Sequence, residues 1–393
     1  MIAVIGGSGE IGLWLVQRLA RQGEDLRVIH RGALSPHVAR FPLDSRRADL
    51  RDALSIQRVL EGCSVVVNCA IDKTQYPSQR QQVQMNITAC QHLLAACRNN
   101  RVARLIHLSS IVVLPPRVTP EVTSRTFEYS REKDWYTRAK IATELRVLAA
   151  RNHLEVCVVR PGIVYGPYMA WSRVAFWRLA NFRVCLPDPR SCISRCYAVH
   201  AADVAALIHR CIRHQGMLPP LIHAVSPERL SWHDFYTEHA RAVGMQDSTE
   251  PCPLSVLRSQ VVAAQEPLLS RSIRWLGACP LLDPARSSPW FRSVATRVKA
   301  SLPTPPSAPV HSQARARGIG TNPLWPSDFE LKMYSSSGEF TPAQSGMDVG
   351  FSYRVRFADG CREAADWWMY RLPDLRPSDL ASMRPLLPGS QAL

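Results

Sequence analysis

The sequence predicts an α/β fold in which a doubly wound parallel sheet is followed by a smaller C-terminal lobe. Short apolar runs alternate with helix-length amphipathic segments throughout residues 1–160, a pattern typical of repeated βαβ units. A glycine-rich turn stands between the first apolar run and the first amphipathic segment, as in Rossmann-type sheets. After residue 160 the regular alternation fades, so we expect a second architecture there.

The elements of the first part follow from hydrophobic periodicity and from the polar residues that end each run. The predicted strands are Ile2–Ile5, Leu26–Ile29, Val65–Cys69, Leu105–Leu108 and Val156–Val159. The predicted helices between them are Leu13–Gln22, Val83–Arg98 and Trp135–Ala150. Helices that connect parallel strands cover both faces of the sheet, and we assign residues 1–165 to this first domain.

Residues 166–372 should form mainly the second lobe, although residues 199–225 are expected to return to the sheet. The predicted elements are a helix at Val199–Ile212, a strand at Leu221–Val225, a helix at Ser231–Val243 and a last helix carrying Trp367 and Trp368. Residues 301–326 are rich in Pro, Ser and Ala, which indicates an exposed connector. Residues 373–393 should be a flexible tail.

The chain is basic, with a formal charge of +16 from 48 Lys and Arg against 32 Asp and Glu. Only five of the basic residues are Lys, so the excess is nearly all Arg. Such an excess occurs in proteins that bind nucleic acids, anionic membranes or phosphorylated ligands. The sequence has no dense Lys/Arg run, so we interpret the excess as scattered surface arginine and expect no nucleic-acid partner.

The lengths of the apolar runs and the positions of the cysteines indicate in which cellular compartment the protein works. The sequence opens on a predicted strand, and no apolar stretch reaches the ~18 residues of a membrane-spanning helix. Twelve Cys lie mostly inside apolar segments, without a Cys-x-x-Cys pair. Cys192, Cys196 and His200, beside Cys185, come nearest to metal-ligand spacing, but buried thiols are the preferred interpretation. We therefore expect a cytoplasmic protein without a metal site.

The glycine-rich turn is the first candidate binding site. It runs from Gly6 to Gly12 and joins the first predicted strand to the first helix. Glycines permit a tight turn, allow backbone N–H groups to approach a pyrophosphate and let helix pack on strand, while the helix N-terminus attracts phosphate. A purely structural turn is the alternative. The residues expected to contact a dinucleotide are Gly6, Ser8, Gly9, Glu10, Ile11 and Gly12.

The end of the second strand bears on the type of dinucleotide. Proteins that prefer NAD usually carry an acidic residue near this point, which binds the ribose 2′-hydroxyl. This chain has Arg31, 19 residues after Gly12, which could pair with the 2′-phosphate of NADP. We therefore favour NADP(H) over NAD(H), with a solvent-facing Arg31 as the alternative. Asp49 and Leu50, after the third strand, are expected at the adenine ring.

A second constellation combines a tyrosine, a lysine and a serine. Tyr136 and Lys140 are four residues apart in a predicted helix, so they share one face. A cation one turn away favours the phenolate and lets Tyr136 act as a general acid or base. Ser110 follows the strand that ends at Leu108, where its hydroxyl could bind the same substrate oxygen. A turn or capping serine is the alternative for Ser110.

Together these residues resemble the extended short-chain dehydrogenase/reductase family of nucleotide-sugar epimerases, dehydratases and reductases. The further motifs that carry the resemblance are Asn68-Cys69-Ala70, Met85-Asn86-Ile87-Thr88, Arg160-Pro161-Gly162-Ile163-Val164-Tyr165-Gly166-Pro167, Val199-His200-Ala201-Ala202-Asp203-Val204-Ala205 and Phe357-Ala358-Asp359-Gly360. The resemblance implies proton transfer by Tyr136, a Lys140 that also holds the nicotinamide ribose, and substrate orientation by Ser110. The other cofactor contacts that it implies are Cys69, Ala70, Asn86, Pro161, Gly162 and Ile163.

Two departures from the family pattern narrow the reaction. Sugar dehydratases carry an Asp-Glu pair where this chain has Ile111 and Val112, so elimination of water is disfavoured. Epimerases of the galactose type usually carry an acid in place of Arg31. We therefore predict an NADP(H)-dependent oxidoreductase acting on a secondary alcohol or ketone, on a nucleotide sugar or related metabolite. An epimerase is the alternative, and a dinucleotide-sensing or nucleic-acid-binding regulator on the same fold is the alternative of another class.

The second lobe is expected to complete the substrate pocket. Five arginines could clamp a diphosphate there, with solvated surface positions as the alternative: Arg173, Arg178, Arg183, Arg190 and Arg195. Residues 254–282 alternate apolar residues with Arg, and we favour a lid or dimer face over peripheral membrane contact. The resemblance also implies a homodimer through the helices at Val83–Arg98 and Trp135–Ala150.

Overall fold

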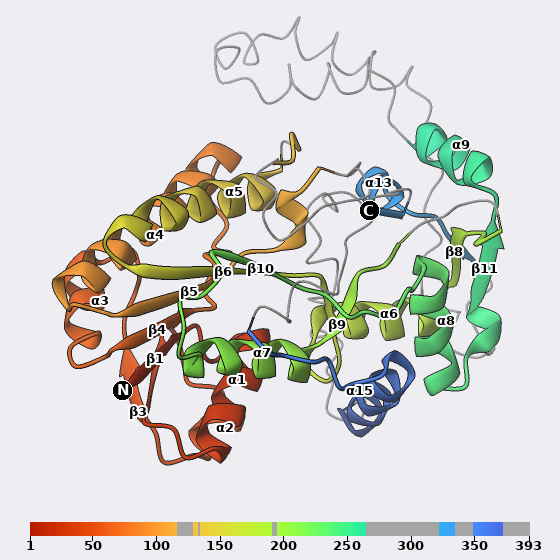
Figure 1. The fold of residues 1–393 in the computed structure, drawn as a ribbon. Helices are drawn as coiled ribbons and strands as arrows, with labels where there is room; N and C mark the ends of the chain where they lie inside the picture. Colours follow the sequence, from red (N-terminus) through yellow and green to blue (C-terminus); the bar gives the residue numbers. More distant parts are fainter. Residues whose placement is uncertain (116–128, 133, 191–194, 265–321, 335–348, 372–393) are drawn as a thin grey trace, which may run out of the picture.

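The computed structural model describes residues 1–115, 129–132, 134–190, 195–264, 322–334 and 349–371. Its centre is a seven-stranded parallel sheet in the order β10-β6-β5-β4-β1-β2-β3 (Figure 1). The strands are β1 Ile2–Ile5, β2 Leu26–His30, β3 Asp44–Arg47, β4 Val65–Asn68, β5 Arg104–Leu108, β6 Glu155–Pro161 and β10 Leu221–Ala224. The predicted Rossmann-type α/β fold is confirmed.

Helices cover both faces of this sheet. Figure 1 shows α1 (Glu10–Arg21) and α7 (Ala201–Arg213) on one side, with α3 (Ala53–Val59), α4 (Gln79–Asn99) and α5 (Trp135–Ala149) on the other. Successive side chains of a strand point to opposite faces. Accordingly, Val4 joins the core cluster of α1 and α7, and Ala3 joins the cluster of α3, α4 and α5.

The second lobe contains a three-stranded parallel sheet in the order β11-β8-β12 and a two-stranded pair, β7 with β9. The strands are β7 Ile163–Tyr165, β8 Arg183–Pro187, β9 Ala198–His200, β11 Thr249–Cys252 and β12 Pro323–Leu324. The helices are α6 Ala170–Asn181, α8 Trp232–Ala242, α9 Leu254–Ala264, α13 Asp328–Tyr334 and α15 Phe357–Arg371, and the short α2 Pro36–Ala39 belongs to the first part. An aromatic core holds the lobe together, with Trp232, Phe235 and Tyr236 fully buried.

Several element boundaries differ from the predicted ones for local reasons. Helix α1 begins at Glu10 because the glycine turn supplies its N-cap, Gly9. Helix α4 begins at Gln79 because the Ser78 hydroxyl accepts a hydrogen bond from the backbone N–H of Gln81 at 3.2 Å. The helix predicted from Val199 is wrong over its first two residues: Val199 lies in β9, which pairs with β7.

The return of the chain to the sheet is visible in β10, which pairs in parallel with β6. The domain boundary at residue 165 stays a prediction. The predicted connector lies almost entirely outside the described residues, and so do the tail at 373–393 and most of the 254–282 segment. The final predicted helix, with Trp367 and Trp368, is α15.

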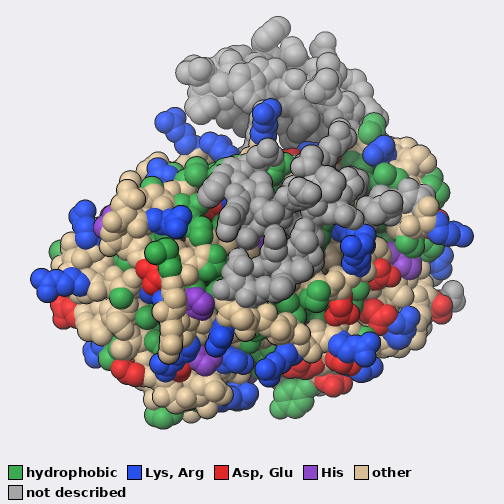
Figure 2. Space-filling model, viewed as in Figure 1, with side chains coloured by type: hydrophobic (Ala, Val, Ile, Leu, Met, Phe, Trp, Pro, Cys, Tyr) green, Lys and Arg blue, Asp and Glu red, His purple; other side chains and the backbone are tan. Residues whose placement is uncertain are grey.

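The described surface carries both signs of charge. On the face drawn in Figure 2, Lys and Arg side chains are interspersed with Asp and Glu. Across the ranges that the structure describes, no helix is both long and apolar enough to cross a bilayer. Within the same ranges, no group of three or more His, Cys, Asp or Glu side chains is arranged to hold a metal ion.

Candidate cofactor and catalytic site

The glycine turn is shaped by contacts that larger residues could not make. Gly6 has a φ of +76°, in the region that favours glycine. A Cβ at Gly12 would lie 2.2 Å from the carbonyl oxygen of Gly6, so helix and turn can pack this closely only without a side chain. Gly9 caps α1 without any side-chain hydrogen bond, so backbone N–H groups at the helix start are left for a ligand. The turn therefore fits the pyrophosphate of a dinucleotide.

The neighbouring residues of the turn are fixed by the rest of the molecule. The Ser8 hydroxyl accepts a hydrogen bond from the backbone N–H of Ser35 at 3.1 Å, which ties the turn to the segment after β2. Glu10 forms an ion pair with Arg173 of α6 at 2.8 Å. Ile11 packs against the core cluster of α1 and α7.

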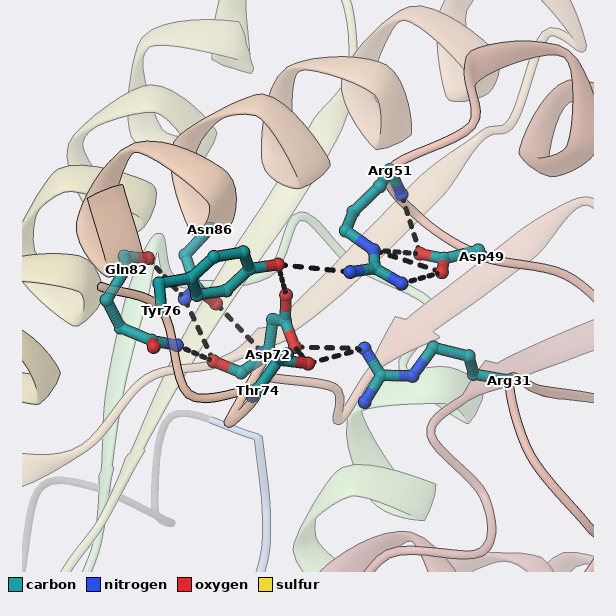
Figure 3. Close-up of polar contacts among 8 residues, drawn as sticks. All are labelled: Arg31, Asp49, Arg51, Asp72, Thr74, Tyr76, Gln82 and Asn86. Carbon is teal, nitrogen blue, oxygen red and sulfur yellow. Dashed lines mark hydrogen bonds and ion pairs between the residues drawn. The ribbon is translucent and has the colours of Figure 1, made fainter. Parts of the chain in front are cut away.

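Arg31 lies just beyond the C-terminal end of β2 and is held by Asp72 (Figure 3). Its Nη1 donates to Asp72 Oδ1 at 2.9 Å and to Thr74 Oγ1 at 3.3 Å. The Arg31 side chain is 49% exposed, and its Nε and Nη2 make no hydrogen bond with the residues that the structure describes. One nitrogen of the Arg31 guanidinium is therefore held by the protein, and about half of the side chain is exposed to solvent.

Asp49 and Leu50 follow β3 and are also engaged. Arg51 donates from Nε to Asp49 Oδ1 at 3.0 Å and from Nη2 to Oδ2 at 2.6 Å, and these hydrogen bonds lower the pKa of Asp49. The carbonyl oxygen of Leu50 lies 3.0 Å from the Nδ1 of His92 on α4. The carboxylate of Asp49 is therefore already paired with a cation.

The segment after β4 reaches the turn and α4 together. A Cβ at Gly6 would lie 3.0 Å from the backbone nitrogen of Ala70, so these two backbones are in close contact. The backbone N–H of Cys69 donates to the carbonyl of Ile5 at 2.9 Å, and burial raises the pKa of Cys69 to about 12. Asn86 is buried, and its side chain binds the backbone of Asp72. The described contacts of Asn86 therefore position the segment after β4.

Sequence reasoning did not identify Asp72, Thr74 or Tyr76 as site residues. Together with Arg31, Asp49 and Arg51 they form a continuous chain of hydrogen bonds, which we call the Asp72 network (Figure 3). The one available signal was a carboxylate four residues after an apolar strand in a parallel sheet, the edge at which such folds bind ligands.

Ser110, Tyr136 and Lys140 lie together at the ends of β5 and α5, and we call them the Tyr136 set. Ser110 begins a short helical turn at Ile111–Val113, and its hydroxyl accepts a hydrogen bond from the Val112 N–H at 3.3 Å. Burial raises the pKa of Tyr136 to about 12, although a hydrogen bond with Ser110 opposes this. Lys140 Nζ lies 5.9 Å from the centre of the Tyr136 ring.

Lys140 is buried and tied to the sheet. Its Nζ donates to the carbonyl oxygen of Leu108 at 2.7 Å, and its exposed fraction is 5%. Burial lowers the pKa of Lys140 to about 8. The ammonium is thus still charged at neutral pH, but close enough to its pKa to exchange a proton.

The segment Pro161–Ile163 joins β6 to β7. Gly162 donates its N–H to the carbonyl of Ala224 at 3.0 Å, and Ile163 donates to the carbonyl of Tyr197 at 2.8 Å. A Cβ on Gly162 would lie 2.0 Å from the Tyr197 carbonyl oxygen, so only glycine fits. This segment leaves the same edge of the sheet that carries the Tyr136 set.

Buried polar side chains of α5, β6 and β10 contact one another, and they were also not identified from the sequence. Arg160 and Glu144 form an ion pair in which both side chains are 0% exposed. Arg160 Nη1 also lies 3.3 Å from His223 Nε2, and Tyr129 donates its hydroxyl to Glu144 at 3.0 Å. The signal was present in the sequence as polar residues inside otherwise apolar strands.

The five arginines considered for a diphosphate clamp are largely committed elsewhere. Arg173 pairs with Glu10, Arg183 with Glu250 at 3.8 Å and Arg190 with Asp188 at 3.0 Å. Arg178 is buried against Glu330 and donates to Tyr236 Oη at 2.9 Å, and Arg195 also has a partner. Arg178 is therefore part of the core of the second lobe rather than a solvated surface cation.

A family model described as the NAD dependent epimerase/dehydratase family matches residues 2–220, more than half of the chain. The chain belongs to this family. The description of the family names NAD dependence together with epimerases and dehydratases.

The curated relatives carry the names of different enzymes, among them a reductase and a dehydrogenase. Cinnamoyl-CoA reductase 2 of Medicago truncatula is 29% identical over 186 residues, which cover 43% of this chain and 55% of the relative. The decarboxylating sterol-4-alpha-carboxylate 3-dehydrogenase of Mus musculus is 29% identical over 170 residues, covering 42% and 46%. The chain thus spans about half the length of the curated relatives it matches.

Solved structures resemble almost the whole chain. UDP-glucose 4-epimerase of Thermotoga maritima, solved with UDP-glucose, superposes with a TM-score of 0.62 at 15% identity. The superposition covers 94% of this chain and 99% of the epimerase. At this identity the likeness shows a shared fold, which includes the second lobe.

Proposed function

We propose that the protein is an NADP(H)-dependent oxidoreductase that interconverts a ketone and a secondary alcohol. The observation that carries this proposal is the Tyr136 set, which follows β5 at the same edge of the sheet at which the glycine turn follows β1. Bound NADP(H) supplies or accepts the hydride. Every proton of the reaction then has to be handled by this chain's own residues.

Tyr136 is the proton donor in the direction of reduction. With a pKa of about 12 the phenol is protonated at neutral pH, so it can donate to a carbonyl oxygen as that oxygen gains negative charge. Ser110, already hydrogen-bonded to Tyr136, is the second donor to the same oxygen. The Lys140 ammonium, 5.9 Å from the ring, stabilises the phenolate left behind.

Arg31 supports the choice of NADP(H) over NAD(H). Arg31 follows the second strand, near whose end Rossmann folds bind the ribose 2′ position. Among the described residues its Nε and Nη2 have no hydrogen-bond acceptor, so both can donate to a phosphate in parallel. Position 31 carries an arginine in place of the acidic residue that would accept a hydrogen bond from a free ribose 2′-hydroxyl. We keep Gly6, Ser8, Gly9, Glu10, Ile11 and Gly12, with Asp49, Leu50, Cys69, Ala70, Asn86 and Pro161–Ile163, as cofactor contacts on the same proposal.

A nucleotide-sugar epimerase is the second candidate. It is favoured by the likeness to UDP-glucose 4-epimerase over 94% of the chain. A net reductase is favoured instead by Arg31 and by sequence relatives that are named reductases and dehydrogenases. An epimerase returns the hydride to its substrate, so turnover with a steady NADPH absorbance would favour the epimerase.

The test is a fluorescence titration of the protein with NADPH and with NADH, repeated on Arg31→Ala. We expect NADPH to bind more tightly, and the variant to lose at least tenfold in NADPH affinity while NADH affinity changes less than twofold. Arg46→Ala is the matched control, because Arg46 is also exposed and paired with a carboxylate, Asp44. Equal loss for both cofactors, or no loss in Arg31→Ala, would contradict the choice of NADP(H).

A further inference from the structure

Asp72 is a buried carboxylate at the centre of the Asp72 network (Figure 3). Its side chain is 6% exposed. Oδ1 accepts from Arg31 at 2.9 Å and from the hydroxyl of Thr74 at 2.6 Å, and Oδ2 accepts from the Tyr76 hydroxyl at 2.8 Å. Burial raises the pKa of Asp72, but these donors together lower it to about 2. The carboxylate is therefore ionised at any pH at which the protein would work.

The backbone of Asp72 is fixed as firmly as its side chain. The carbonyl oxygen accepts from the side-chain amides of Gln82 at 2.7 Å and Asn86 at 3.1 Å. The N–H donates to Asn86 Oδ1 at 2.9 Å. Gln82 and Asn86 are both 5% exposed and stand one turn apart on α4. Asp72 is thus a rigid anchor whose position is set by the long helix α4.

From this anchor the network reaches a second guanidinium. Tyr76 accepts a hydrogen bond from Arg51 Nη1 at 3.0 Å while donating to Asp72. Arg51 uses its other edge for Asp49. One carboxylate therefore organises Arg31, from the end of β2, and Arg51, from the segment after β3.

The contact with Asp72 restrains the Arg31 side chain before any ligand binds. An unrestrained arginine loses side-chain entropy when it is immobilised by a ligand, and an arginine already held loses less. Asp72 binds Nη1 alone, and within the described part of the chain the Nε–Nη2 edge keeps two parallel donors, the geometry that matches a phosphate. The oxygens of Asp72 are occupied by donors of the protein, so this carboxylate does not serve as the acceptor that a free 2′-hydroxyl needs.

We propose that Asp72 is a specificity-determining positioning residue, which holds Arg31 for the 2′-phosphate of the dinucleotide and is itself withheld from the ribose. The inference rests on the NADP(H) choice of the proposed function. The negative charge of Asp72 partly offsets the positive charge with which Arg31 attracts the 2′-phosphate. The preorganisation of Arg31 outweighs this loss of attraction.

The experiment compares two ligands that differ only in the 2′-phosphate, 2′,5′-ADP and 5′-AMP, by isothermal titration calorimetry. In Asp72→Asn we expect the affinity for 2′,5′-ADP to fall about tenfold and that for 5′-AMP to change less than twofold. Asp44→Asn is the matched control, because Asp44 is also an arginine-paired aspartate but lies at the first residue of β3. It should leave both affinities unchanged.

Two further variants make the result decisive. Tyr76→Phe keeps the Arg31–Asp72 pair and removes one donor to Asp72, so we expect a two- to threefold loss confined to 2′,5′-ADP. Because Tyr76 is only partly buried, this variant tests the proposal even where Asp72→Asn fails to fold. Arg31→Ala should abolish the preference for 2′,5′-ADP over 5′-AMP.

The outcomes separate the inference from the proposed function. Loss of 2′,5′-ADP affinity in Arg31→Ala, but unchanged or tighter binding in Asp72→Asn, overturns the positioning role and leaves NADP(H) selection intact. Unchanged binding in Arg31→Ala overturns both. Where Asp72→Asn does not fold, wild-type affinity of Tyr76→Phe for 2′,5′-ADP overturns the positioning role.

Discussion

The Asp72 network and the Tyr136 set follow neighbouring strands at one edge of the sheet, yet they control charge in opposite ways. In the network, hydrogen-bond donors overcome burial and bring the pKa of Asp72 down to about 2. In the Tyr136 set, burial prevails, so the pKa of Tyr136 rises to about 12 and that of Lys140 falls to about 8. Fixed charges suit binding, whereas a phenol that stays protonated beside an ammonium suits proton donation to a carbonyl oxygen.

The largest effect should come from Tyr136→Phe, which removes the proposed proton donor. We expect the rate of ketone-dependent NADPH oxidation to fall by about 10²–10⁴-fold, the usual contribution of a positioned acid. The affinity for 2′,5′-ADP should change less than twofold, because the Asp72 network is untouched. A comparable loss of 2′,5′-ADP affinity would show that the two regions are not separate.

Glu144→Gln should cost the most stability. The substitution leaves Arg160 buried without its anionic partner. Because an unpaired buried charge is unfavourable, the free energy of unfolding should fall by about 3–5 kcal/mol. Asp49→Asn is the matched control, since the Asp49–Arg51 pair is partly exposed, at 29% and 34%, and should cost under about 1 kcal/mol. Urea denaturation monitored by tryptophan fluorescence measures both. Equal losses would mean that burial does not distinguish the two ion pairs.

Acid should destabilise the folded protein through its buried histidines, of which His107 is one. Burial, and Lys140 nearby, lower the pKa of His107 to about 3, against an ordinary value of about 6.5. Between these values the unfolded chain binds the extra proton and the folded protein does not, so stability is lost as the pH falls. From pH 6.5 to pH 5 the loss for this one group is about 2 kcal/mol.

The assignment to His107 can be checked by urea denaturation at pH 7 and pH 5. His107→Gln should lose about 2 kcal/mol less than the wild type between these two conditions. The exposed His153, changed to Gln, should leave the loss unchanged. The stability that Asp72 contributes should begin to fall only near pH 4, where the carboxyl of the unfolded chain starts to bind a proton, and should be lost by about pH 2. An unaltered acid loss in His107→Gln would contradict this assignment.

Local sequence was enough for the features that depend on neighbours in the chain. A few neighbouring residues are enough to indicate the glycine turn, each apolar strand and the helical spacing of Tyr136 and Lys140. The fold and the Tyr136 set could therefore be predicted. The Asp72 network could not, because its contacts join segments after β2, β3 and β4 with α4. Similarly, Val199 has an apolar helical pattern, but pairing with β7 makes it a strand residue.

The placement of β10 has a consequence for synthesis of the chain on the ribosome. The sheet needs Leu221–Ala224 to cover the outer edge of β6, and β7, α6, β8, β9 and α7 are made in between. Until those residues emerge, β6 presents an unpaired strand edge, which is a template for misassociation. Truncation at residue 165 would leave this edge of β6 permanently open, so we expect such a fragment to associate with itself more readily than the whole chain.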